Sequence, residues 1–273
     1  MELVPSSIAH AADLIGAADG LLITAGAGMG VDSGLPDFRG AAGFWRAYPV
    51  LAAAGIRFQD IADPAHFRVD ASLAWGFYGH RLKLYRDTVP HPGFATLRRW
   101  AEAKPLGSFV FTSNVDGQFQ KAGLTEVCEA HGSIHRLQCI DGCRQAIWPA
   151  DSFQPEVDET SCRLLNAPPR CPHCGEVARP NILMFSDEAW VARRTEGQRW
   201  ELREWLAQGM NLVAIEIGAG TEISTVRAFT EHSGMPYLRI NLREPQVRGR
   251  LGTGLAMGAA EALARIDARL NAS

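Results

Sequence analysis

The sequence predicts an α/β fold in which helices cover both faces of a parallel sheet, together with a smaller discontinuous domain. Four short apolar runs have the length and composition of buried strands, at residues 21–24, 109–112, 212–217 and 237–241. Apolar residues at helical spacing lie between or after these runs, around 94–103, 195–208, 224–232 and 255–270. This alternation indicates a parallel sheet, because crossover helices join parallel strands.

A further helix is expected at the start of the chain, where Ser6-Ser7 can cap it and Gly20 would end it. Two stretches interrupt the alternation, and we expect them to form the smaller domain. Residues 45–89 are rich in aromatic residues and arginine without a strand run, which predicts a helical insert. Residues 139–176 carry four cysteines and several prolines.

The composition excludes several classes of protein. The chain has 273 residues, of which 47% are hydrophobic and 21% are charged, as in ordinary globular proteins. Its 27 basic and 30 acidic residues argue against a protein dedicated to nucleic acid or to anionic membranes, because such binders need a basic surface. No apolar run reaches the ~18 residues of a membrane helix, and no secretory signal is recognisable. We therefore expect a cytoplasmic protein with reduced cysteines.

Four of the six cysteines form two pairs, Cys139 with Cys143 and Cys171 with Cys174. Two such pairs can supply four thiolates to a tetrahedral zinc ion, although the spacer between them exceeds the usual ~15–20 residues. With four sulfur ligands no position is left for water or substrate, so the zinc would be structural. The alternative is four separate thiols. Cys128 and Cys162 are expected to be small buried apolar residues.

The loop Gly26-Ala27-Gly28-Met29-Gly30 follows the first strand run and resembles a dinucleotide-binding turn, in which glycines let backbone N–H groups approach a pyrophosphate. Val31 stands where that motif has a third small residue, so a tight structural turn would explain these glycines equally well. The continuation is unusual for a mere turn: it reads Asp32-Ser33-Gly34-Leu35-Pro36-Asp37-Phe38-Arg39-Gly40.

Taken together, these motifs resemble those of the sirtuins, the NAD-dependent protein lysine deacylases. Gly-Ala-Gly followed by Ser-Gly-Leu-Pro-Asp-Phe-Arg is similar to the signature of that family, and further motifs follow in the family's order from residue 24 to about residue 260. They are Thr112-Ser113-Asn114-Val115-Asp116 with Ala122-Gly123, His131-Gly132-Ser133, the four cysteines, Arg179-Pro180 with Phe185, and Ile240-Asn241.

The resemblance implies a Rossmann-like NAD-binding domain of residues 1–44, 90–138 and 177–273, a helical insert of residues 45–89 and a zinc module of residues 139–176. It implies that the carbonyl oxygen of an acylated lysine, on a protein or peptide substrate, attacks the ribose of NAD and expels nicotinamide. His131 would then deprotonate a ribose hydroxyl, and the acyl group would pass to ADP-ribose. Without the other motifs, a lone histidine is more often structural.

The resemblance also implies roles for single residues. Asp116 would anchor the nicotinamide amide, Asn114 would contact ribose or an ordered water, Phe38 would shield the ribose, and Arg39 would fix the cofactor loop. Asn and Asp after a strand are also ordinary turn formers. The remaining predicted cofactor contacts are Gly26, Ala27, Gly28, Asp37, Ser113, Gly218, Ala219 and Asn241, and Phe185 is a predicted substrate contact.

Tyr78 and Arg81 lie three residues apart in the predicted insert, so on a helix they share a face. Sirtuins that prefer succinyl- or malonyl-lysine carry a tyrosine and an arginine at this spacing, and a guanidinium suits a carboxylate. The resemblance therefore implies a pocket for an acidic acyl group. The alternative is a surface helix that bears an arginine and a half-buried tyrosine.

The chain departs from the family pattern at Gly30, at Ser113, at Ser186-Asp187 and at Ala219-Gly220, where two hydroxyls are missing. These departures leave two rival functions open. The first is a protein ADP-ribosyltransferase or NAD hydrolase on the same fold. The second is a non-catalytic module in which zinc stabilises a partner-binding surface. The joint presence of Asn114, Asp116 and His131 argues against this second function.

Overall fold

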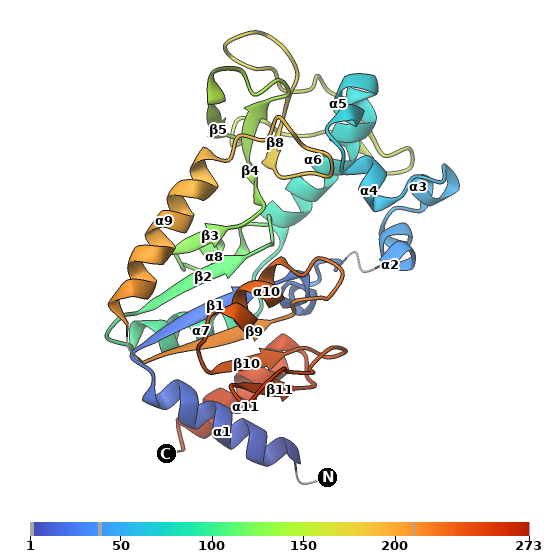
Figure 1. Ribbon diagram of the computed structural model, residues 1–273. Coiled ribbons are helices and arrows are strands. Elements are labelled where there is room, and N and C mark those ends of the chain that lie inside the picture. Colours follow the sequence, from blue (N-terminus) through green and yellow to red (C-terminus); the bar gives the residue numbers. More distant parts are fainter. Residues whose placement is uncertain (1–2, 38–39, 210, 273) are drawn as a thin grey trace.

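Six parallel strands form the main sheet of the computed structural model, which describes residues 3–37, 40–209 and 211–272 (Figure 1). Their order is β11-β10-β9-β1-β2-β3, and every neighbouring pair is parallel. The predicted parallel sheet is therefore confirmed, and each predicted run is a strand in it. The strands are β1 (Gly20–Ala25), β2 (Ser108–Thr112), β3 (Val127–Glu129), β9 (Leu212–Ile217), β10 (Tyr237–Ile240) and β11 (Gly252–Leu255).

Helices cover both faces of this sheet, as predicted. Leu22 of β1 lies in the core under α9 and α10, whereas its neighbour Ile23 lies in the core under α1, α7 and α11. A strand that is buried on both faces has a continuous apolar sequence, which is why these runs could be recognised. The helices are α1 (Leu3–Ala17), α7 (Pro92–Glu102), α9 (Arg193–Gln208), α10 (Thr225–His232) and α11 (Ala259–Leu270).

Several predicted boundaries were wrong. Ser6 and Ser7 lie inside α1 and do not cap it, and the helix ends at Ala17 and not at Gly20. Leu255 closes β11, so the helix predicted to begin there begins at Ala259. The strands β3 and β11 were missed because they are short and lack an apolar run: they read Val-Cys-Glu and Gly-Thr-Gly-Leu.

The smaller part of the molecule, drawn at the top and right of Figure 1, has a hydrophobic core of its own. There Phe44 and Trp75 of the helices pack against Ile134 and Leu137 of a small sheet, and Trp75 Nε1 donates to Ala178 O at 2.9 Å. Its helical elements are α2 (Gly40–Ala47), α3 (Pro49–Ala53), α4 (Phe58–Ile61), α5 (Ala65–Val69), α6 (Ala71–Asp87) and the 3-10 turn η3 (Cys143–Gln145). Its strands are β4 (Gly132–Cys139), β5 (Ile147–Pro149), β6 (Val157–Asp158), β7 (Arg163–Leu164) and β8 (Ala178–Ile182).

The small sheet is antiparallel with the order β5-β4-β8, and β6 pairs with β7 beside it. Because β4 begins at Gly132 and β8 ends at Ile182, the sequence-based division at residues 139 and 176 runs through this sheet. Only Ala130 and His131 separate β3 of the main sheet from β4. His131 thus lies where the two parts meet. No described helix has both the length and the apolarity needed to cross a bilayer.

Candidate active site

The carboxyl ends of β1, β2, β9 and β10 lie at one edge of the main sheet. The strand order reverses between β1 and β9, since the chain continues from β1 to β2 and β3 on one side and from β9 to β10 and β11 on the other. Open parallel sheets bind ligands in the crevice at such a switch point. Gly26 follows β1 and Gly218 follows β9, so both begin loops at this crevice.

The glycines after β1 permit a close approach between these two loops. A Cβ on Gly26 would lie 2.8 Å from Ala219 Cα, and a Cβ on Gly28 would lie 2.7 Å from Gly218 Cα. The N–H of Gly28 donates to Gly218 O at 3.0 Å, so this amide is bonded within the protein. Ala27, between the glycines, begins the 3-10 turn η1 (Ala27–Met29). The tight-turn explanation therefore accounts for Gly26 and Gly28.

The loop after β2 is tied to the glycine loop. Asn114 Nδ2 donates to Gly26 O at 3.0 Å, and the Asn114 N–H donates to Thr112 Oγ1 at 3.0 Å. The N–H of Ser113 donates to Ala25 O at 3.2 Å. These contacts bring Ser113 and Asn114 beside the end of β1.

Asp116 is a buried carboxyl with a strongly shifted pKa. Its side chain accepts a hydrogen bond from the Gln118 N–H at 2.9 Å, and its backbone oxygen lies 2.9 Å from His135 Nε2. Burial raises the pKa of Asp116 from 3.8 to about 6, and the neighbouring Glu129 adds to the rise. Shifts of this kind gather at functional sites. His135, which has no counterpart in the family motifs, thus supports the Asp116 backbone.

His131 is held against the end of β2 and the start of α10. The N–H of Ala130 donates to Thr112 O at 2.8 Å, and His131 Nε2 lies 3.2 Å from Thr225 Oγ1. Burial, with a smaller effect of Arg199, lowers the pKa of His131 below its usual value. The lowered pKa favours the neutral imidazole, which is the form that acts as a base.

The residues around His131 restrict its backbone. Gly132 has a φ of 78°, and a Cβ there would lie 2.1 Å from Asn181 O. The backbone oxygen of His131 accepts from the Leu183 N–H at 2.9 Å. His131 is thus fixed between the main sheet and the segment that follows β8.

Phe185 lies on this segment, at the border with the helical part. Its N–H donates to Ala62 O at 2.9 Å, its ring meets the Phe58 ring edge to face at 6.0 Å, and it remains 38% exposed. Asp187 forms a fully buried ion pair with Arg179 at 2.6 Å, so it has a structural role. Between Phe185 and Asp187, Ser186 has a φ of 53° in the region that favours glycine.

Tyr78 and Arg81 lie side by side in the smaller core and are only 1% and 7% exposed. Arg81 Nε and Nη2 donate to Tyr85 Oη at 3.0 and 2.9 Å, and the guanidinium carbon lies 5.7 Å from the centre of the Tyr78 ring. Burial raises the pKa of Tyr78 to about 12, so this phenol is neutral. The Arg81 charge also lowers the pKa of Asp116 against the effect of burial. The alternative of a surface helix is therefore wrong.

Asn241 follows β10 and is 4% exposed. Its Nδ2 donates to Ala219 O at 2.8 Å, and its Oδ1 accepts from the N–H groups of Arg243 and Glu244, both at 3.0 Å. The side chain thus joins the loops after β9 and β10. Phe38 and Arg39 lie outside the described residues, and Asp37, directly before them, is half-buried.

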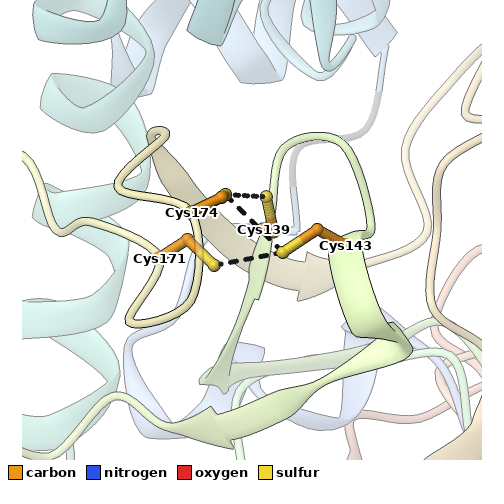
Figure 2. Close-up of side chains that lie close together, drawn as sticks. All are labelled: Cys139, Cys143, Cys171 and Cys174. Carbon is orange, nitrogen blue, oxygen red and sulfur yellow. Dashed lines mark hydrogen bonds between the residues drawn. The ribbon is translucent and has the colours of Figure 1, made fainter.

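The four predicted zinc ligands come together at the far end of β4 from His131 (Figure 2). All four Sγ atoms lie within 4.8 Å of one another, and three of the separations, drawn in Figure 2, are 3.5 Å. A tetrahedral Zn–S₄ site with bonds of about 2.3 Å has sulfur separations of about 3.8 Å, so the cluster fits zinc. Strand β4 spans about 20 Å between Gly132 and Cys139. The zinc site is therefore structural. Cys128 and Cys162 are buried elsewhere, as predicted.

A comparison with known families decides the relationship. Residues 26–201 match the model of the Sir2 family. The chain belongs to the Sir2 family. The matched range contains the glycine loop, His131 and the four cysteines.

Several curated proteins resemble this Sir2-family chain. The NAD-dependent protein deacylase of Pyrococcus furiosus is 35% identical over 164 residues, which are 59% of each chain. The mitochondrial NAD-dependent protein deacylase sirtuin-5 of the dog is 30% identical over 196 residues, which are 67% of this chain and 61% of the relative. The chain thus spans about three fifths of the length of the curated relatives it matches.

Solved structures agree with the family assignment at the level of the fold. A Sir2 homologue in complex with NAD superimposes with a TM-score of 0.72 over 96% of this chain and 93% of the other, at 21% identity. The Sir2-family chain thus has the Sir2 fold.

Thr225 and Arg227, like Gln118, touch the site and were not predicted from the sequence. Thr225 contacts His131, and Arg227 donates to the Ala219 carbonyl at 3.2 Å. The pattern at 224–232 indicated only a helix. Contacts between residues so distant along the chain carry no signal in a single sequence.

Proposed function

We propose that this Sir2-family protein is an NAD-dependent protein lysine deacylase, which transfers an acyl group from lysine to ADP-ribose and releases nicotinamide. One observation carries the proposal: a buried imidazole, positioned by hydrogen bonds, lies beside the switch-point crevice. His131 adjoins β2 through Ala130, and Asn114 in the loop after β2 contacts the glycine loop. A base and a dinucleotide-binding crevice are thus adjacent.

Bound NAD supplies the electrophilic ribose carbon and the nicotinamide leaving group. With NAD bound, His131 would take a proton from a ribose hydroxyl, a role that its lowered pKa favours because the neutral imidazole is the basic form. Asp116 would accept a hydrogen bond from the carboxamide of nicotinamide, while the Gln118 N–H holds the carboxyl in place. The Asn114 amide, which is bonded to Gly26 O, would orient the ribose or an ordered water.

We propose that an acylated peptide lies along the segment after β8. The side chains of Leu183 and Phe185 there are 39% and 38% exposed, although both are large and apolar. The Leu183 N–H is bonded to His131 O, so a peptide on this segment lies near the base. Phe185 would contact the aliphatic part of the acyl-lysine.

We propose further that the acyl group is acidic, succinyl or malonyl. Arg81 is a cation in an aromatic core, with the rings of Phe77, Tyr78 and Tyr85 at 5.2, 5.7 and 5.4 Å from its guanidinium carbon. An acyl carboxylate at this site would find a planar cation and a neutral phenol as donors. Gln118 links this core to the loop after β2, because its N–H is bonded to Asp116 and its Nε2 donates to Tyr85 O at 3.0 Å.

Mass spectrometry tests the reaction. The protein is incubated with NAD and with acetyl-, succinyl- or malonyl-lysine peptides, and deacylated peptide and O-acyl-ADP-ribose are expected in equal amounts. H131A should abolish both products, whereas H10A, which removes an exposed histidine of α1, should leave them unchanged. Formation of free ADP-ribose when no acylated peptide is added would indicate an NAD hydrolase. Transfer of label from labelled NAD to protein would indicate an ADP-ribosyltransferase. Either result would refute deacylation.

The acyl preference is tested with R81M. Loss of the guanidinium should lower kcat/KM for the succinyl peptide at least about 100-fold more than for the acetyl peptide, since a charge-assisted bond is replaced by a buried unpaired carboxylate. The matched control is K83M, which removes an exposed cation of the same helix. Equal decreases of kcat/KM for both peptides would show that Arg81 has only a structural role in the core.

A further inference from the structure

The loop after β9 forms one wall of the crevice, although Gly218, Ala219 and Gly220 offer no side-chain hydroxyl to a ligand. Gly26 and Gly28 pack directly on its backbone, with no room for a Cβ. The position of this backbone therefore sets the position of the glycine loop. Contacts from α10 and from the loop after β10 hold it.

The guanidinium of Arg227 joins the loop after β9 to the loop after β10. Arg227, in α10, donates through Nε to Ala219 O at 3.2 Å and through Nη2 to Glu244 O. The same Ala219 oxygen accepts from Asn241 Nδ2 at 2.8 Å. Thr221 Oγ1 adds a bond to the Glu244 carboxylate at 2.6 Å. Residues 219–221 are thus bonded to residues 241–244 at several points, and Arg227 bonds to the backbone of both segments.

Arg227 is placed there against unfavourable electrostatics. Burial and the charge of Arg239 lower its pKa, and three carboxylates offset this effect in part. Arg239 is itself fully buried and is bonded to two of them. A second guanidinium beside a buried one needs such compensation. The compensating carboxylates belong to Glu216, Glu231 and Glu244.

We propose that Arg227 is a positioning residue for dinucleotide binding. By bonding the carbonyls of Ala219 and Glu244 it holds the loops after β9 and β10 at the separation that NAD requires. Arg227 acts through these backbone groups and not as a charge on the cofactor phosphates. The proposal rests on the NAD-dependent function proposed above.

Two substitutions separate the two roles of the side chain. Arg227→Ala removes both the charge and the hydrogen bonds. Arg227→Lys keeps the charge, but a lysine has no planar fork that could bond two carbonyls at once. Arg203→Ala is the control, since it removes an exposed cation of α9. NAD affinity is measured by isothermal titration calorimetry, and backbone amide exchange of residues 218–222 and 241–246 is measured without NAD.

Both Arg227 variants should bind NAD about tenfold more weakly, since each loses charge-assisted hydrogen bonds, and their loop amides should exchange about tenfold faster. Arg203→Ala should match the wild type in both measurements. Wild-type affinity in Arg227→Lys would overturn the proposal, because the charge alone would then suffice. Wild-type exchange in both variants would also overturn it.

The exchange measurement does not depend on catalysis. If the wild-type protein bound no NAD, the proposed function would fail, whereas faster exchange would still show that Arg227 joins the loops. Arg227→Lys keeps the positive charge beside the carboxylates of Glu216, Glu231 and Glu244. This variant alone is sufficient for the test if Arg227→Ala does not fold.

Discussion

Replacement of Asp116 by asparagine should stabilise the protein at neutral pH while it impairs NAD binding. Burial raises the pKa of Asp116 from 3.8 to about 6. Because the pKa of Asp116 is higher in the folded state than in the unfolded state, the free energy of unfolding is unaffected by this group below about pH 4. It falls as the pH rises to about 6, where the carboxyl ionises in the folded protein as well. At about 1.4 kcal/mol per pKa unit, the buried charge lowers the free energy of unfolding by up to about 3 kcal/mol above pH 6.

Asparagine carries no charge at any pH and keeps an oxygen for the Gln118 N–H. D116N should therefore match the wild type near pH 4 and exceed its stability by up to about 3 kcal/mol at pH 7 and above. Urea unfolding at pH 5, 6, 7 and 8 measures the difference. A wild type that is more stable than D116N at pH 7, or a difference that does not change between pH 5 and 7, would refute the reasoning.

Asp267 provides a control of opposite sign. Burial acts to raise its pKa, but hydrogen bonds from Trp100 and Arg99 outweigh burial and lower it. Such a carboxylate stabilises the fold above its unfolded-state pKa, and this stability is lost as the pH falls. D267N should thus be less stable than the wild type at pH 7, and the difference should shrink toward pH 4.

Four other outcomes are expected. A strong chelator should release one zinc per chain and lower the melting temperature, and a zinc-free protein that melts unchanged would argue against a structural metal at Cys139, Cys143, Cys171 and Cys174. Thr225→Val should lower kcat and shift the acidic limb of the pH–rate profile, whereas Thr225→Ser should keep both, since its hydroxyl still bonds His131. Ser186→Gly should raise the free energy of unfolding by up to about 1 kcal/mol, because glycine relieves the strain of a positive φ. Gly132→Ala should lower the free energy of unfolding by at least about 1–3 kcal/mol, because alanine would be strained at the positive φ of this position. Urea unfolding measures both changes.

The sheet was predictable because its central strands are buried on both faces. The runs at 21–24 and 212–217 are apolar except at Thr24 and Glu216, and every position in them is buried, so the pattern could be recognised from local sequence alone. The small sheet was missed for the opposite reason. Its strand β8 reads Ala-Arg-Pro-Asn-Ile, in which the buried Arg179 is bonded to Asp187 and the buried Asn181 to Gln138. Such a mixed polar sequence has no local strand pattern.

The candidate site divides in the same way. His131, Asp116 and the cysteine pairs could be picked out because they stand in recognisable motifs. The contact between His131 and Thr225 could not, since these residues are 94 positions apart and only the packing of α10 on the sheet brings them together. The role of Gly26 was also decided by packing: its missing Cβ makes room for Ala219.

The sequence by itself determined the α/β class, the zinc ligands and the family motifs, because these depend on residue type and on spacing along the chain. The tertiary structure decided which groups are buried, which amides are already bonded and which residues hold the loops of the crevice. The burial that raises the pKa of Asp116 and lowers that of His131 is created by elements from distant parts of the chain. The chemistry of the site is therefore a property of the packing.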